Sequence, residues 1–291
     1  MKLILISDLH FTSKQSRQRT GNILEDGRRK LKFIFKKAKK HNADIVCSGD
    51  VFDSPRDIYA LFEFIKIRSQ FPEVKFYTVY GQHDLYMRNK SVMNNLAILG
   101  KANQITLLSN IPIIQDCNLF GAGWGEEIPE PITGINLLAI HRPIYGYEIF
   151  PGQKFTQSES FLEDHHFDVI ISGDIHRDFV LEKQNRFILN SGPIIRHEAT
   201  KFNRQHRPKL FIFDSRDRTI EEIKIPCRID PFDKRFYSSL KNNHEFIDQE
   251  FIQALSMESN LNIDSIIENL ISQSPNKEKI KSKLGEINAR D

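Results

Sequence analysis

The feature that most constrains this chain is a series of short apolar runs that each stop at polar or glycine residues. Runs of this length are too short for helices and are typical of buried strands. In the first two thirds of the chain they cover 3–6, 44–47, 75–79, 118–120, 136–140 and 168–171. Amphipathic stretches of helical length lie between the early runs, at 26–41, 57–70 and 91–99. Strands alternating with helices predict an α/β domain built on a buried sheet.

The pattern changes after about residue 178, where apolar runs come in pairs joined by turn-forming residues. The pairs are 179–182 with 186–189 and 209–213 with 219–225. Two strands joined by such a short turn are typical of a β-hairpin. From residue 231 onward the apolar positions recur at helical spacing, in 246–255 and 263–271, and 277–287 is a third candidate helix. We therefore predict a domain of residues 1–226 and a helical appendage of residues 227–291.

Composition excludes several classes of protein. Hydrophobic residues make up 40% of the 291 positions, which is enough for a packed core and excludes general disorder. No apolar run approaches the ~18 residues that a membrane helix needs. The hydrophobic start reaches Asp8 too soon for a signal peptide, and three distant cysteines do not form a disulfide framework. We expect a cytoplasmic protein. The net charge of +3 does not by itself indicate a nucleic-acid partner.

Chemically active residue types follow five of the predicted strands. They are Asp8 and His10, Asp50, Gln82 with His83 and Asp84, His141, and Asp174 with His176. Because the carboxyl ends of strands form one edge of an α/β sheet, we expect these side chains to meet. Oxygen and nitrogen ligands without cysteine suit Mn²⁺, Mg²⁺ or Fe²⁺ and argue against a thiolate zinc site. Two such ions side by side are suited to hydrolysing a phosphate ester.

The order of these motifs, D-x-H, G-D, G-x-H-D, H and G-x-x-H, resembles that of the calcineurin-like metallophosphoesterase superfamily. The resemblance covers about residues 1–215 and implies a two-sheet sandwich flanked by helices. Within the superfamily the chain is most similar to the SbcD-type recombination and repair nucleases, including those of phages. The narrower likeness rests on residues 7–10, on residues 48–53, and on Ser191-Gly192-Pro193 before a basic stretch.

The resemblance implies a role for each motif residue. One metal would be held by Asp8, His10, Asp50 and His176. The second would be held by Asp50, which bridges the two ions, with Gln82, His141 and Asp174. His83 would act on the scissile phosphate as transition-state stabiliser or general acid, and Asp84 would orient its ring.

Two positions depart from the family pattern, and both fall on the second metal. The family usually has Asn where this chain has Gln82 and His where it has Asp174. Glutamine offers the same amide oxygen on a longer stem, and aspartate replaces a neutral nitrogen with an anionic oxygen. We expect a harder second site that favours Mn²⁺ or Mg²⁺ over Zn²⁺. The alternative is a weakened second site and a slow or inactive enzyme.

The resemblance also implies partners. The loop after His10, with Lys14, Arg17 and Arg19, would approach DNA, and Arg196 opens the second basic stretch. The C-terminal helices would dock on the coiled-coil base of an SMC-like, SbcC-type ATPase, or would instead pack back on the catalytic domain. The family commonly dimerises through helices on the nuclease domain, for which 91–99 is the candidate. The basic run 28–40 is either a solvated helix face or a phosphate-attracting patch.

The leading hypothesis is a metal-dependent DNA nuclease, exo- or endonucleolytic, that acts in recombination, repair or phage DNA processing. One alternative is a phosphodiesterase for small molecules such as cyclic nucleotides. The other is a scaffold that binds DNA or the partner without cutting. The histidines outside the five motifs, including His165, His166 and His197, receive no role.

Overall fold

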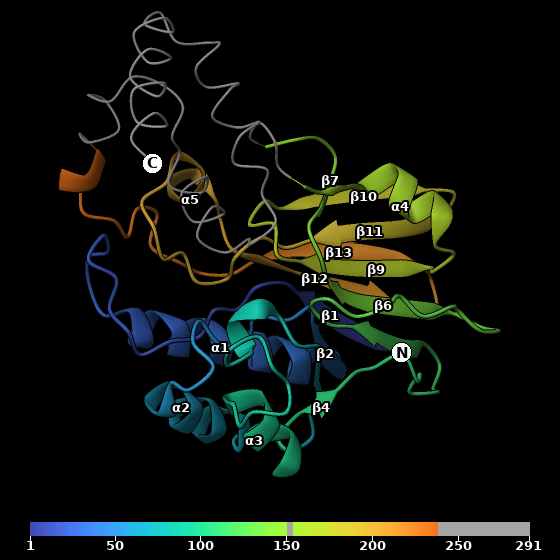
Figure 1. The fold of residues 1–291 in the computed structure, drawn as a ribbon, viewed down its shortest axis with the longest axis horizontal. Helices are drawn as coiled ribbons and strands as arrows, with labels where there is room; N and C mark the ends of the chain where they lie inside the picture. Colours follow the sequence, from blue (N-terminus) through green and yellow to red (C-terminus); the bar gives the residue numbers. More distant parts are fainter. Residues whose placement is uncertain (150–153, 238–291) are drawn as a thin grey trace, which may run out of the picture. The chain divides into compact units, whose positions relative to one another are not determined.

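The structure, a computed structural model, describes residues 1–149 and 154–237 of the chain (Figure 1). Within these ranges, residues 1–145 and 156–237 belong to one compact unit that holds both large sheets. The predicted helices of 246–287 lie outside the described residues, and the boundary after residue 226 stays a prediction. Across the described ranges, no helix is long and apolar enough to span a lipid bilayer.

A six-stranded sheet carries the first three motifs. Its order is β13-β12-β1-β2-β3-β4. The strands are β1 (Lys2–Ile6), β2 (Ala43–Cys47), β3 (Phe76–Thr78), β4 (Thr106–Leu107), β12 (Lys209–Asp214) and β13 (Thr219–Lys224). β1 and β2 are parallel, with Ile6 opposite Cys47. This register brings the residues after Ile6 and after Cys47 to the same edge of the sheet.

A five-stranded sheet carries the remaining motifs, in the order β10-β11-β9-β6-β5. Its strands are β5 (Asn118–Ala122), β6 (Asn136–His141), β9 (Val169–Gly173), β10 (Phe179–Lys183) and β11 (Arg186–Asn190). β6 and β9 are parallel, and His141 lies opposite Gly173. His141 and the residue after Gly173 therefore share one edge. Both predicted hairpins, β10–β11 and β12–β13, are present as antiparallel pairs.

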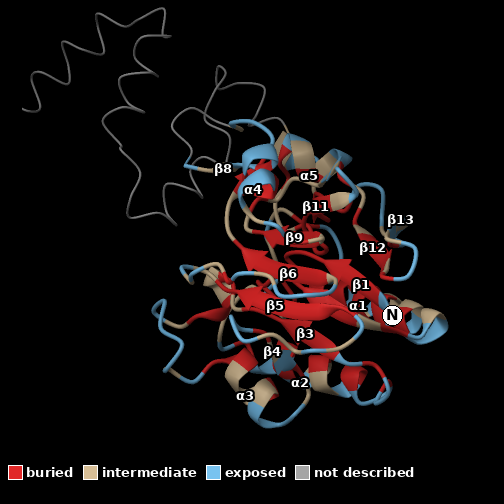
Figure 2. Ribbon diagram, turned by 90° about the vertical axis from the view of Figure 1, so that its right-hand side faces the viewer, coloured by how far each residue is buried: buried red, intermediate tan, exposed pale blue. Residues whose placement is uncertain are grey.

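Alternation along β1 shows how the layers pack. Leu3 and Leu5 belong to a buried cluster shared with strands of the other sheet, whereas Ile4 and Ile6 pack with the helices. Successive strand residues point to opposite faces, so each strand serves both layers. Figure 2 shows the resulting run of buried residues through both sheets. The predicted two-sheet sandwich with flanking helices is confirmed for the described residues.

Helices cover the outer faces of the sandwich (Figure 1). They are α1 (Ile23–His41), α2 (Ile58–Arg68), α3 (Asn95–Lys101) and α4 (Ser158–Asp164), and a short helix α5 (Lys201–Gln205) lies in the segment between β11 and β12. Residues of α1 and α2 pack in the core cluster of the six-stranded sheet, and Phe161 and Leu162 of α4 pack in that of the five-stranded sheet. The sequence analysis missed α4, α5 and β4. The short parallel pair β7 (Ile144–Tyr145) and β8 (Thr156–Gln157) was also missed.

The basic side chains of the run 28–40 are exposed or half-buried on α1, with one exception. Lys30 is buried, donates to the carbonyl oxygen of Ile194 at 2.8 Å, and pairs with Asp26 at 3.1 Å. Burial lowers the pKa of Lys30 to about 8, even with the Asp26 carboxylate opposing that shift. Lys30 is thus an internal tie between α1 and the segment around residue 194.

The Asp57 carboxylate joins α2 to the loop that follows His10. As the N-cap of α2 it accepts from the Ala60 amide at 3.0 Å. It also accepts from the Ser13 amide at 2.7 Å, from the Ser13 hydroxyl at 2.6 Å and from the Thr12 hydroxyl at 3.1 Å. One side chain therefore caps a helix and anchors the loop.

We expect Asp57→Ala to lower the free energy of unfolding by about 2–4 kcal/mol, because a helix cap and three loop hydrogen bonds are lost together. The matched control is Asn22→Ala, which removes the exposed cap of α1 with its one bond to the Glu25 amide, and should cost about 1 kcal/mol. Denaturant unfolding in chelator measures both variants. Equal losses would show that the loop contacts of Asp57 contribute nothing.

Candidate metal centre

The two sheets bring the predicted ligands to one place, where the strands β1, β2, β3, β6 and β9 end. Three groups have ligand atoms within 4.8 Å of one another: Asp8, His10 and His176; His10, Asp50 and His83; and Asp8, Asp50 and His141. Residues far apart in the sequence, from both sheets, thus surround a common centre.

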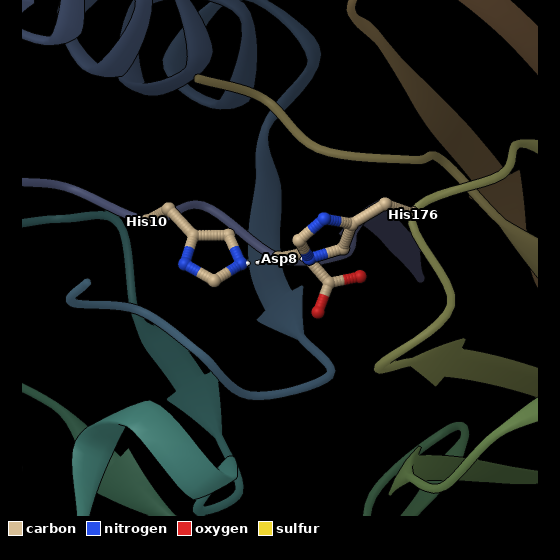
Figure 3. Close-up of side chains that lie close together, drawn as sticks. All are labelled: Asp8, His10 and His176. Atoms are coloured by element: carbon tan, nitrogen blue, oxygen red, sulfur yellow. Dashed lines mark hydrogen bonds between the residues drawn. The ribbon is translucent and has the colours of Figure 1, made fainter. Parts of the chain in front are cut away.

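The first group has the spacing of ligands on one ion. The Nε2 atoms of His10 and His176 are 2.9 Å apart, and Figure 3 shows these nitrogens pointing toward one another beside the Asp8 carboxylate. The planes of the two rings are nearly perpendicular. Two imidazole nitrogens bound to one ion at ~2.0–2.1 Å, with perpendicular bonds, lie about 3 Å apart. The first group therefore fits a divalent cation without rearrangement of these nitrogens.

Asp50 belongs to two of the groups and is fully buried. Its Oδ2 atom lies 3.5 Å from His141 Nε2 and 3.8 Å from His10 Nε2. His141 Nδ1 lies 2.7 Å from the carbonyl oxygen of Ser48 and must donate to it, because a carbonyl only accepts. His141 Nε2 is therefore the ring nitrogen left for a cation. Asp50 thus lies close to imidazoles of both predicted sites, where the resemblance implies a shared ligand.

The two positions that depart from the family pattern lie against each other. Gln82 opens the 3₁₀ turn η1 (Gln82–Asp84) after β3, and its Nε2 atom donates to Asp174 Oδ1 at 2.6 Å. The same Asp174 oxygen is 4.0 Å from His141 Nε2. The structure thus brings both Gln82 and Asp174 to the predicted second site.

Four buried polar atoms test whether cations fit here. Asp8 Oδ2, Asp50 Oδ2, Gln82 Oε1 and His141 Nε2 have no hydrogen-bond partner within the described part of the chain. A buried polar atom without a partner costs about 1–3 kcal/mol, and more when it is charged. Three oxygens and one imidazole nitrogen, all belonging to predicted ligands, form a donor set suited to a hard divalent cation.

The backbone at the strand ends is held in an unusual conformation. Asp8, His10, Asp50 and Asp174 have φ values of 42°, 48°, 46° and 82°. Left-handed conformations of non-glycine residues cost of order 1–3 kcal/mol and cluster at functional sites. Here they coincide with four of the seven predicted ligands.

Glycine is required where the motif loops meet. A Cβ atom on Gly81 would lie 2.0 Å from Asp50 Oδ1, which is far inside contact distance. Another on Gly49 would lie 2.6 Å from His141 Nδ1. These absent side chains allow β2, β3 and β6 to end around the same carboxylate.

Like charges and burial shift the pKa values of the cluster. Burial raises the pKa of Asp8 to about 7, with Asp50 adding to the effect against the opposing pull of His141. Burial alone would lower the pKa of His141, but Asp50 and Asp8 outweigh it and raise the pKa to about 10. For His10, burial is likewise outweighed, by Asp53 and Asp50, and the pKa rises to about 9. Without cations, protons therefore occupy positions that the ligands would use for metal.

His83 lies at the centre, but Asp84 does not orient its ring as the sequence analysis expected. The His83 amide donates to Asp50 Oδ1 at 2.9 Å, and its Nδ1 atom lies 3.2 Å from the carbonyl oxygen of Asp53. The buried Asp84 carboxylate instead accepts from the amides of Val51, Phe52 and Gly81, at 3.3, 3.0 and 3.1 Å. Neighbours in a 3₁₀ turn point about 120° apart, so the two side chains diverge.

The sequence analysis gave no role to two residues that support His10. Asp53 Oδ1 is 3.4 Å from His10 Nδ1, an ion-pair distance, on the side of the ring where a carboxylate commonly orients a metal-binding imidazole. His197 Nε2 lies 3.2 Å from the His10 carbonyl oxygen, to which it donates. The signal for Asp53 was its place three residues after Asp50. His197 had none, because the contact of Ser7 with Pro193 that brings it near joins distant segments.

Two predicted DNA contacts are wrong, since Arg19 and Arg196 are buried. Arg19 pairs with Asp26 at 2.8 Å and donates to the Arg196 carbonyl oxygen. Arg196 donates to the carbonyl oxygens of Asn203, His206, Arg228 and Ile229. A guanidinium group committed to internal acceptors cannot reach a phosphate. Of the same predicted set, Lys14 and Arg17 are exposed.

We expect metal binding to release protons. At pH 7 the raised pKa values keep His10 and His141 protonated, and a histidine must be neutral to bind a cation. Mn²⁺ affinity should therefore rise with pH up to about pH 9–10. About two to three protons should be released at pH 7, because Asp8, with a pKa of about 7, is about half protonated there. Calorimetry in buffers of different ionisation enthalpy measures this number. Affinity that is independent of both pH and buffer would contradict the proposed ligand set.

Comparisons with known proteins show which family the chain belongs to. The family model for calcineurin-like phosphoesterases matches residues 1–178. A search of curated protein sequences finds no match. Among solved structures, an archaeal phosphodiesterase is 15% identical, with a TM-score of 0.43, and the match covers 77% of this chain and 99% of that one.

Two further solved structures are similar. The calcineurin-like phosphoesterase YfkN from Bacillus subtilis is 11% identical, with a TM-score of 0.46, over 88% of this chain and 98% of that one. A putative 5'-nucleotidase from Staphylococcus aureus has the same identity, TM-score and share of this chain, but only 58% of its own length is covered. The family model spans more than half of the sequence. This chain therefore belongs to the calcineurin-like phosphoesterase family of metal-dependent phosphoester hydrolases.

Proposed function

We propose that this protein is an SbcD-type DNA nuclease that hydrolyses phosphodiester bonds with two Mn²⁺ or Mg²⁺ ions. The observation that carries the proposal is that Asp50 belongs to two ligand groups, one with His10 and His83 and the other with Asp8 and His141. An exposed basic loop that begins four residues after His10 supports DNA as the substrate, because cations beside the centre would attract the phosphate backbone.

The ligand set supports Mn²⁺ or Mg²⁺ rather than Zn²⁺. Three carboxylates, Asp8, Asp50 and Asp174, meet at the centre, together with the amide oxygen of Gln82. Oxygen-rich sites favour hard cations. When bound, the two ions would supply the Lewis acidity that activates water and neutralises charge on the phosphate.

The contacts of His83 support a role in proton transfer. Its Nδ1 atom faces the carbonyl oxygen of Asp53 and must carry hydrogen, which leaves Nε2 as the nitrogen that exchanges a proton with substrate. The ring lies edge-on to His10, with 4.9 Å between centroids, and its amide is fixed by Asp50. We propose that His83 protonates the leaving oxygen of the nucleic acid.

The proposed partners rest on the sequence. The helices that would bind an SMC-like ATPase lie outside the described residues. For the proposed homodimer, Leu96 and Leu99 of the candidate segment 91–99 pack in the core, and Met93 is exposed. α2, which contacts α3, also exposes Ile58 and Phe62.

We expect His83→Ala to slow DNA hydrolysis by about 10²–10⁴-fold while Mn²⁺ binding is retained. Bis-p-nitrophenyl phosphate should lose far less, because its leaving group departs without a proton. The exposed His166→Ala is the matched control. Initial rates with Mn²⁺, Mg²⁺, Zn²⁺ and chelator test function and metal preference together.

Each outcome of that assay is decisive. If His83→Ala lowered the hydrolysis rates of the two substrates equally, His83 would not act as a general acid. Its role would then be to stabilise charge in the transition state. Turnover of the small ester without any DNA cleavage would favour a small-molecule phosphodiesterase. Activity with Zn²⁺ equal to that with Mn²⁺ would overturn the metal preference.

Arg17→Ala and Arg196→Ala should separate DNA binding from stability. Arg17→Ala removes an exposed guanidinium group and should weaken DNA binding. It should also reduce the salt dependence of binding by about one phosphate contact, with the free energy of unfolding unchanged. Arg196→Ala should instead lower the free energy of unfolding by about 2–4 kcal/mol, because buried carbonyl oxygens lose their donor. Salt titrations of DNA binding and denaturant unfolding measure the two effects. An unchanged salt slope in Arg17→Ala would exclude this loop from the DNA interface.

A further inference from the structure

We infer that Gln82 and Asp174 act as one hydrogen-bonded unit that closes the second cation site, and not as two independent ligands. The inference rests on the proposed function only for the catalytic use of the second ion. Its structural basis is the 2.6 Å bond from Gln82 Nε2 to Asp174 Oδ1. Gln82 follows β3 of the six-stranded sheet and Asp174 follows β9 of the five-stranded sheet, so the bond crosses between the sheets.

The direction of this hydrogen bond gives the two polar atoms of the Gln82 amide different roles. The amide nitrogen can only donate, and the carboxylate can only accept while it is ionised. The opposite orientation would set the amide oxygen against the carboxylate. The nitrogen therefore holds Asp174, which leaves Oε1 buried and without a hydrogen-bond partner in the described part of the chain. That oxygen is the ligand atom that Gln82 offers to a cation.

Side-chain length makes each residue depend on the other. Asparagine at position 82 would be one methylene shorter and could not both reach Asp174 and keep its oxygen at the centre. A residue without an acceptor at position 174 would leave the Gln82 nitrogen unpaired and its oxygen unoriented. The two departures from the family pattern thus compensate each other across the gap between the sheets.

Asp174 also connects this unit to the first ligand group. Its amide donates to Asp8 Oδ1 at 3.0 Å, from a backbone with φ of 82°. Glycine adopts that conformation without strain and keeps the amide. Asp174→Gly therefore removes the carboxylate alone and leaves the contact with Asp8 intact.

The test is a double-mutant cycle on Mn²⁺ binding to the full chain. Calorimetry and electron paramagnetic resonance would follow both ions in the wild type, Gln82→Ala, Asp174→Gly and the double variant. Each single change should lower the affinity for the second ion by about 10–100-fold. If the pair is one unit, the double variant should be no weaker than about the worse single variant. Independent ligands would give losses that multiply, and that result would overturn the inference.

Conservative variants separate the hydrogen bond from the charge. Asp174→Asn keeps an acceptor oxygen and tolerates the left-handed backbone, so Gln82→Ala should still be non-additive in that background. The pair Gln82→Asn with Asp174→His should bind the second ion more tightly than either change alone. The coupled pair would be contradicted if that double variant did not recover affinity for the second ion. It would also be contradicted if the loss of affinity caused by Gln82→Ala were additive in the Asp174→Asn background.

Two controls separate this inference from the proposed function. The first ion, bound near His10 and His176, should change by less than about 3-fold in every variant, and thermal unfolding in chelator confirms folding. Because binding is read without substrate, coupling can hold even if no DNA is cut. Conversely, the protein could hydrolyse DNA while the losses of Mn²⁺ affinity in the two single variants add up in the double variant. That result would contradict the coupled pair and leave the proposed nuclease function unaffected. A wild type that binds only one Mn²⁺ would overturn the inference outright.

Discussion

The Asp50 carboxylate is the group on which the site depends. It is fully buried at the seam of two sheets, beside imidazoles from β6 and from the loop after β1. It also accepts from the His83 amide. Burial opposes its ionisation, yet the neighbouring histidines outweigh that effect and lower its pKa. A charge so enclosed needs cationic neighbours, which protons on His10 and His141 supply until metal replaces them.

A second set of residues holds this centre in shape without reaching into it. Asp53 pairs with the ring of His10, and His197 donates to the His10 carbonyl oxygen. The Asp84 carboxylate accepts hydrogen bonds from three backbone amides where two of the motif loops meet. Farther out, the buried Arg196 joins its own segment to residues 203–206 and 228–229. Precise spacing of metal ligands requires such support, because each ligand stands on a separate loop.

Much of the fold could be predicted from the sequence. The strands follow from short apolar runs, because burial of alternating side chains is a local pattern. The two-sheet sandwich was implied by the resemblance of the motif order to a known family. Short elements such as β4, α4 and α5 were missed, since a few residues carry too little periodicity to stand out. Asp8, His10, Asp50, His141 and His176 share one centre, although the sequence analysis expected a single sheet edge. The ends of β1 and β2 in one sheet meet those of β6 and β9 in the other.

Other properties were decided only by the tertiary structure. Arg17 and Arg19 look alike in the sequence, yet one is exposed and the other buried against Asp26. Gln82 and Asp174 appear as two unrelated departures until the sheets pack and bring them within 2.6 Å. The sequence determined which residue types end the strands, because that pattern is local. Which of them touch, and which face solvent, was decided by the packing of one sheet on the other, because those contacts join residues many positions apart.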